Sequence, residues 1–163
     1  MATTLPLAAG LLAALAGACG PNDPPIVTCE AAANDVLATI ELGAPGDDDG
    51  PFVPLGDGDS AMYRYGGQGG TMLAFRLRVT VAAGAALPEC VLPTTRATVA
   101  GSGEELFASQ QPLALHVGPG PTEGVTDTYL NQIYASIPPA GTAITVTVTA
   151  GPATATRMLL AQP

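Results

Sequence analysis

The chain contains no lysine and no tryptophan, and its basic residues are five arginines against fourteen acidic residues in 163 positions. The net charge of −9 repels the phosphates of nucleic acids and anionic lipid headgroups, so neither is an expected partner. Aromatic residues make up only 4% of the chain, whereas glycine and proline number 20 and 16. This composition disfavours long helices and is typical of short strands joined by tight turns.

The sequence has one histidine and three cysteines, which limits the metal and catalytic chemistry that it can support. His116 lies in the apolar run Leu-Ala-Leu-His-Val, and no Gly-x-Ser-x-Gly elbow exists, so we interpret it as a strand or rim histidine. The Gly66-Gly-Gln-Gly-Gly70 segment lacks the Lys-Ser/Thr of a phosphate-binding loop and predicts a hairpin turn. We identify no catalytic residue and expect the chain not to be an enzyme.

Residues 1–18 carry no charged side chain, and the apolar stretch 5–18 is too short for a comfortable membrane span. The stretch ends in Leu-Ala-Gly-Ala-Cys-Gly, which resembles a bacterial lipoprotein cleavage site. This pattern predicts a signal peptide over residues 1–18 and a mature chain that begins at Cys19, with palmitate among the lipid attached there. The alternatives are ordinary signal cleavage nearby, which would give a secreted protein, or a leader that stays attached.

Residues 19–25 follow as a proline-rich tether that cannot continue a helix or join a central strand, and a single domain occupies residues 26–163. Glycine rather than aspartate after the cysteine is typical of lipoproteins sorted to the outer membrane. We therefore expect a cell-envelope protein held on the membrane by its N-terminal lipid. The sequence leaves a protein or glycan partner and the oligomeric state open.

From residue 26 onward, β-prone runs alternate with turn signals at the spacing expected of a sandwich or barrel. In 71–81 apolar residues occupy the odd positions from Leu73, which predicts a central strand with Arg76 and Arg78 facing solvent. Residues 150–153 form a short turn, so the last two runs should pair as an antiparallel hairpin. The predicted strands span residues 26–30, 36–42, 52–55, 61–65, 71–81, 94–99, 113–117, 129–137, 142–149 and 154–160. The only helix-compatible stretch, 30–38, is interpreted as a turn before a strand.

Part of this pattern resembles a known group of proteins. The segments concerned are Ile40-Glu-Leu-Gly43, an acidic loop, Phe52-Val-Pro-Leu55, Gly58-Asp59, Gly66-Gly-Gln-Gly-Gly70 and the closing hairpin from Gly141 to Leu160. Together they resemble uncharacterised predicted bacterial lipoproteins with an immunoglobulin-like β-sandwich. The resemblance implies an all-β, antiparallel sandwich of the immunoglobulin-like type after a lipoprotein signal peptide, and it implies no reaction.

With Cys19 assigned to the lipid, Cys29 and Cys90 remain as an even pair in an oxidising compartment, which predicts a disulfide. In the chain-entropy model, closing a loop of this length stabilises the fold by about 4 kcal/mol. The alternative is two unpaired thiols.

Acidic side chains concentrate between residues 41 and 59, where flexible loops with several carboxylates could bind calcium. The spacing does not match an EF-hand, so solvated turn carboxylates are the competing interpretation. The calcium alternative would also suit a hydrolase or a carbohydrate-active accessory domain, whereas our main hypothesis is a surface binding or structural module. The candidate metal ligands are Asp47, Asp48, Asp49, Asp57 and Asp59.

Tyrosine supplies four of the seven aromatic residues. The tyrosines could form a binding face, but we expect at least two of them to be core or cross-strand residues. The four are Tyr63, Tyr65, Tyr129 and Tyr134.

Overall fold

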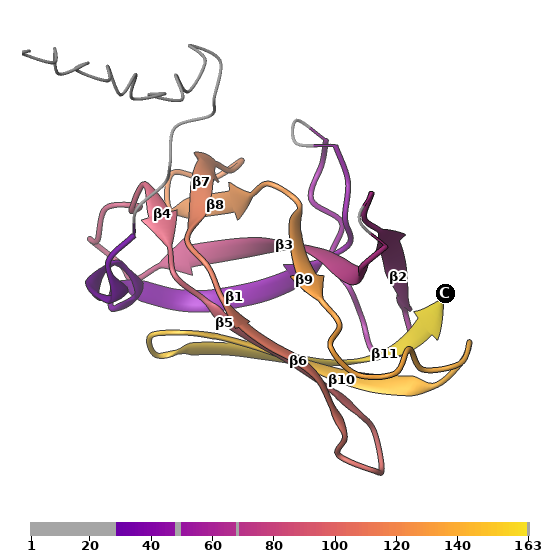
Figure 1. Ribbon diagram of the computed structural model, residues 1–163. Helices are drawn as coiled ribbons and strands as arrows, with labels where there is room; N and C mark the ends of the chain where they lie inside the picture. The colour runs from indigo at the N-terminus through magenta and orange to yellow at the C-terminus, as the bar shows by residue number, and fades with distance from the viewer. Residues whose placement is uncertain (1–28, 48–49, 68, 163) are drawn as a thin grey trace, which may run out of the picture.

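A computed structural model describes residues 29–47, 50–67 and 69–162 of the chain (Figure 1). The described residues form eleven strands and a single 3-10 helix, η1, so the predicted all-β class is confirmed. The predicted signal peptide, the lipidated Cys19 and the tether lie outside the described residues. The elements are η1 (Ala31–Asn34), β1 (Leu37–Gly43), β2 (Ser60–Tyr65), β3 (Thr71–Val81), β4 (Cys90–Val91), β5 (Thr94–Val99), β6 (Glu105–Gln110), β7 (Leu113–Val117), β8 (Glu123–Thr126), β9 (Tyr129–Gln132), β10 (Ala143–Ala150) and β11 (Ala153–Gln162).

Strand β3 is the central strand, as its length and alternation predict. Its C-terminal half lies between β1 and β8, and its N-terminal half lies between β2 and β9, with antiparallel pairing to all four. Figure 1 shows β1 and β3 running side by side across the middle of the molecule. Because four strands depend on it, the register of β3 decides which side chains meet on either face of the sheet.

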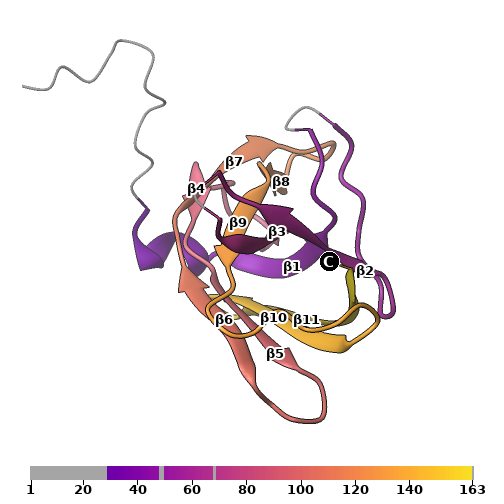
Figure 2. The same cartoon turned by 45° about the vertical axis from the view of Figure 1, so that its right-hand side comes forward.

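Hydrogen bonds connect the strands into one sheet in the order β4-β7-β8-β3-β2-β11-β10-β5-β6, with β1 and β9 added on β3. The β2–β11 pair is parallel, so the sheet is mixed, whereas the sequence predicted antiparallel pairing throughout. The sheet curls into a half-barrel, and in Figure 2 the β10–β11 hairpin passes beneath β1. This hairpin is the one predicted at the end of the chain, joined by a turn at Gly151 and Pro152.

The core fills the inside of the curl. Leu73, Phe75, Leu77 and Val79 on β3 are all at most 1% exposed, as their odd positions predict. They belong to the same core cluster as the apolar side of β10, where Ile144, Val146 and Val148 alternate with threonine and are fully buried. Burying each such side chain contributes about 1.5–3 kcal/mol, so these two strands supply much of the driving force for folding.

The prediction that the β3 arginines face solvent is wrong for Arg76, which is 3% exposed. Arg76 does point away from the core, but the loop after β1 folds over it. Arg78 is one third exposed and lies beside Glu41 of β1. Alternation along a strand separates the two faces of a sheet, and it does not report whether a loop covers the outer one.

Three predicted strands differ from the structure. In the strand predicted at 26–30, Cys29 and Glu30 are not part of a strand, and residues 26–28 lie outside the described part. Residues 52–55 form only an isolated bridge between Gly43 and Pro54, because two prolines interrupt the ladder. The strand predicted at 129–137 ends at Gln132, because Ile133 then donates to Thr71 on β3 while Tyr134 donates to Leu106 on β6.

Three short strands, β4, β6 and β8, were not predicted. Of these, β6 pairs with β5 across a turn in which Gly101 and Gly103 adopt positive φ. Strand β8 follows the glycine-proline turn after β7 and is only four residues long. Short strands with weak alternation depend on their partners for their conformation.

Candidate functional site

Four strands each bring one residue into a row on the face of the sheet opposite the core. Arg78 on β3 is in register with Glu41 on β1 and with Val125 on β8. His116 on β7 is in register with the same Val125. Neighbouring strands lie about 4.8 Å apart, so the row extends over roughly 15 Å. The register of the sheet, and not nearness in sequence, assembles these side chains.

Two connections rise beside this row and enclose a cleft of about 780 Å³, which we call the β3–β8 cleft. The loop after β1 forms one wall with Pro51 and Phe52, and the β7–β8 turn forms the other with Val117 and Pro119. Gly43 allows the loop to fold back, since a Cβ at this position would collide with the ring of Phe52. The cleft therefore has apolar walls and a charged floor.

Arg76 connects the loop after β1, which forms the first wall, to the end of β8 in the floor. Its Nε donates to the carbonyl oxygen of Thr126 at 3.0 Å. Its Nη1 donates to the carbonyl oxygens of Asp47 at 3.2 Å and Gly50 at 2.9 Å. Hydrogen bonds from a charged donor are stronger than neutral ones, so this one guanidinium holds the loop and the end of β8 in a fixed relation.

Arg78, which lines the floor of the cleft, forms an ion pair with Glu41 on the neighbouring strand β1. Both Nε and Nη2 of Arg78 donate to the same oxygen, Oε2 of Glu41. The guanidinium carbon of Arg78 also lies 4.8 Å from the centre of the Phe52 ring, within cation–π range. Both side chains of the pair are about one third exposed, and a ligand in the cleft would reach Arg78.

His116 and Asp127 form a second polar pair at the other end of the row. Nε2 of His116 lies 2.9 Å from Oδ1 of Asp127, and this carboxylate oxygen is buried without a well-aligned hydrogen bond. Both side chains are about half exposed. His116 lies on strand β7, as the sequence predicts, but its carboxylate neighbour was not foreseen because β8 was not predicted.

The side chains of the β3–β8 cleft suit the binding of a ligand. A histidine beside a carboxylate can also accept a proton, and a carboxylate can act as a nucleophile. The described residues that line the cleft include no serine, threonine, cysteine, lysine or tyrosine. Arg76 already donates hydrogen bonds to three backbone carbonyl oxygens. The cleft can therefore hold a ligand between paired charges.

The three predicted calcium ligands that the structure describes, Asp47, Asp57 and Asp59, do not form a group that could hold a metal ion. The carboxylate of Asp57 accepts the backbone N–H of Met158 at 2.8 Å, and that of Asp59 accepts the N–H of Gly56 at 2.7 Å. Asp47 is exposed at the far end of the loop, where its carbonyl oxygen binds Arg76. Within the described ranges, no group of three His, Cys, Asp or Glu side chains could hold a metal ion. The candidates Asp48 and Asp49 lie outside those ranges.

The tyrosines divide evenly between core and surface, as expected. Tyr63 and Tyr129 are buried, whereas Tyr65 and Tyr134 are 67% and 77% exposed. Burial raises the pKa of the Tyr129 hydroxyl, which lies 3.1 Å from Oγ1 of Thr95. The buried hydroxyl of Tyr63 has no hydrogen-bond partner in the described structure, and burial raises its pKa as well.

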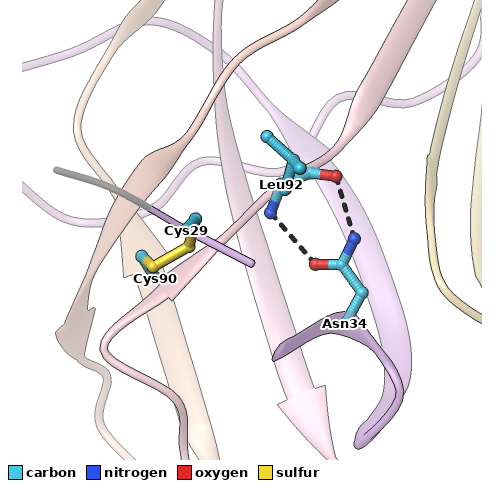
Figure 3. The surroundings of a disulfide bond; sticks show 4 residues. All are labelled: Cys29, Asn34, Cys90 and Leu92. Carbon is cyan, nitrogen blue, oxygen red and sulfur yellow. Dashed lines mark hydrogen bonds between the residues drawn. A yellow bond between two sulfur atoms is a disulfide. The ribbon is translucent and has the colours of Figure 1, made fainter. Parts of the chain in front are cut away.

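Cys29 and Cys90 lie at disulfide distance, with their Cα atoms 5.9 Å apart (Figure 3). Cys90 begins β4 and is paired with Ala114 on β7, two residues before His116. The predicted disulfide would therefore attach the start of the domain close to one end of the β3–β8 cleft. The glycine segment after β2 is the predicted hairpin turn, since β2 and β3 pair antiparallel across it.

In the described ranges of the chain, no helix has the length and apolar character needed to cross a membrane. Comparison of the sequence with protein-family models and with curated proteins, and of the structure with solved structures, finds no match.

Proposed function

We propose that this chain is an extracytoplasmic binding module, held on the cell envelope by a lipid on Cys19 and using the β3–β8 cleft as its binding site. The lipobox-like segment before Cys19 and the proline-rich tether support the attachment. In this proposal the half-barrel is a variant of the immunoglobulin-like sandwich of predicted lipoproteins, and the outer membrane is its location. The partner is a protein or glycan that reaches the cleft.

The observation that carries the binding role is the make-up of the cleft floor. Two polar pairs, Arg78 with Glu41 and His116 with Asp127, lie at either end of a row with Val125 between them. Ligand sites in proteins commonly combine a mainly apolar lining with a few positioned polar groups. Among the described lining residues, Arg76 and Arg78 are held by hydrogen bonds and His116 lies against Asp127, which supports a binding role.

Intact mass tests the attachment. The protein is expressed in a Gram-negative cell and purified separately from the membrane and soluble fractions. We expect a membrane-borne species that begins at Cys19, carries added diacylglycerol and acyl mass, and lacks two hydrogens for the Cys29–Cys90 disulfide. A soluble species cleaved at another position would overturn the lipoprotein proposal and favour a secreted protein.

The alternative function, a calcium-dependent hydrolase or carbohydrate-active accessory domain, depends on the acidic loop. Two of its carboxylates, Asp57 and Asp59, already accept backbone N–H groups, which speaks against it. We expect millimolar calcium to leave the thermal unfolding midpoint unchanged. A rise in the midpoint that disappears in the double variant Asp47→Asn with Asp49→Asn would restore the alternative.

A further inference from the structure

The hydrogen-bonding capacity left open in the β3–β8 cleft indicates a class of ligand, and this inference rests on the binding role proposed above. Because both bonds from Arg78 go to Oε2 of Glu41, Nη1 of the arginine and Oε1 of the glutamate have no hydrogen-bond partner among the described residues. Nη1 carries two N–H groups, so Arg78 presents hydrogen-bond donors to a ligand in the cleft, with an acceptor oxygen of Glu41 beside it.

The second pair offers acceptors. His116 directs Nε2 toward Oδ1 of Asp127, and Nδ1 of the ring and Oδ2 of the carboxylate have no partner among the described residues. Because a carboxylate oxygen can only accept, the hydrogen of the neutral imidazole lies on Nε2, so Nδ1 accepts a hydrogen bond as Oδ2 does. The Arg78 end of the cleft thus offers donors, the His116 end offers acceptors, and the apolar side chain of Val125 lies between them.

The charges of the floor argue against an ionic ligand. The carboxylate of Glu41 is paired with Arg78, so it offers little to a free cation. The chain as a whole carries a net charge of −9, which repels an anion before it reaches the arginines. Arg76 already donates to three backbone carbonyl oxygens. An uncharged ligand meets neither obstacle.

Hydroxyl groups both donate and accept, so a ligand bearing several of them matches a floor of mixed donors and acceptors. The C–H faces of sugar rings are apolar and suit the walls formed by Phe52 and Pro119. The cleft volume of about 780 Å³ lies within the range of roughly 300–1,000 Å³ seen for small-ligand sites, which admits a short run of sugar units. We propose that the β3–β8 cleft binds an uncharged glycan segment, with Arg78, His116 and Asp127 bonding to its hydroxyl groups.

The test is calorimetric titration of the full mature chain, purified in detergent, with a panel of oligosaccharides. The uncharged probes are maltohexaose, cellohexaose, laminarihexaose, mannohexaose and chitohexaose; the charged ones are hexagalacturonate and hexaglucosamine. We expect at least one uncharged probe to bind, and His116→Ala and Arg78→Gln each to weaken its Kd about tenfold or more, the loss expected for a hydrogen bond to a charged or buried partner. His116 is more than half exposed, so its variant should fold even if Arg78→Gln does not.

The matched control is Arg96→Gln, which breaks the exposed ion pair of Arg96 with Glu105 on the β5–β6 hairpin and should leave the Kd unchanged. The glycan assignment would be overturned if only charged probes bind or if no probe binds. It would also be overturned if His116→Ala binds an uncharged probe with the same Kd as the wild type. Binding of a charged probe that is lost in the cleft variants would still support a binding module at this site. The intact-mass experiment tests the lipid attachment independently of the glycan titrations.

Discussion

The side-chain amide of Asn34 pairs with the backbone of Leu92 in both directions. Nδ2 donates to the carbonyl oxygen of Leu92 at 2.8 Å, and the backbone N–H of Leu92 donates to Oδ1 at 3.0 Å (Figure 3). Leu92 lies between β4 and β5. The side chain of Asn34 thus bonds to both backbone groups of Leu92, as a paired strand would. It fixes η1 on the sheet near the Cys29–Cys90 pair.

Replacement of Asn34 by alanine should lower the free energy of unfolding by about 2–3 kcal/mol, because two partly buried backbone groups of Leu92 would lose their partners. Urea denaturation followed by circular dichroism measures the change. Gln111→Ala is the control, since it removes a single exposed bond to the carbonyl of Leu130 and should cost no more than about 0.5 kcal/mol. Equal losses for the two variants would contradict the role given to Asn34.

Gly151, in the turn between β10 and β11, lies directly against η1. Its φ is +55°, and a Cβ there would collide with the carbonyl oxygen of Asn34. Gly151→Ala should therefore destabilise the protein by about 2–4 kcal/mol, from backbone strain together with overpacking. Gly101→Ala separates the two terms, because φ is +89° but nothing lies within 4 Å of the added carbon. We expect it to cost only about 1–2 kcal/mol, and a larger loss at Gly101 than at Gly151 would refute this account.

Removal of the Arg76 guanidinium by Arg76→Met should release the loop after β1 from β8. Three backbone carbonyls, those of Asp47, Gly50 and Thr126, would lose a charged donor, and we expect a loss of about 2–4 kcal/mol. Hydrogen–deuterium exchange should rise mainly in residues 44–52 and at the end of β8. Arg96→Met, at an exposed ion pair, should leave exchange in these segments unchanged. Unaltered exchange in Arg76→Met would show that the loop is held by other contacts.

Stability at high pH should depend on Tyr129. Burial raises the pKa of its hydroxyl, so the folded protein keeps this proton at pH values where the unfolded chain has lost it. The contribution of this group to the free energy of unfolding should therefore be constant below about pH 9 and fall above about pH 10, by up to about 1.4 kcal/mol per pH unit. Tyr129→Phe should reduce that slope, while costing about 1 kcal/mol at pH 8 through the lost bond to Thr95.

Urea titrations at pH 8 and pH 11 test this expectation, with Tyr134→Phe as the control at a side chain that is 77% exposed. Tyr63, whose pKa is also raised by burial, should retain part of the slope in the Tyr129 variant. The same slope in wild type and Tyr129→Phe would assign the alkaline loss of stability to other groups.

The sequence by itself determined the features that depend on local alternation and on turn residues. Apolar residues at every second position made β3 a central strand and placed Leu73, Phe75, Leu77 and Val79 in the core. Alternating threonines and a Gly-Pro turn specified the closing hairpin, β10 with β11. The even count of cysteines left after Cys19 pointed to the Cys29–Cys90 pair, which lies at disulfide distance. These signals are carried by residues close together in the chain, and burial on one face is enough to explain them.

Only the tertiary structure decided what lies on the outer face of that sheet. Alternation places Arg76 opposite the core, but its burial follows from a loop that folds back over Gly43. His116 meets Asp127 because β7 and β8 pair in one register, and β8 is too short and irregular to be recognised from its residues. The parallel β2–β11 pair likewise depends on how the whole sheet curls. Such contacts are set by pairing between distant segments, for which a single sequence contains no local periodic signal.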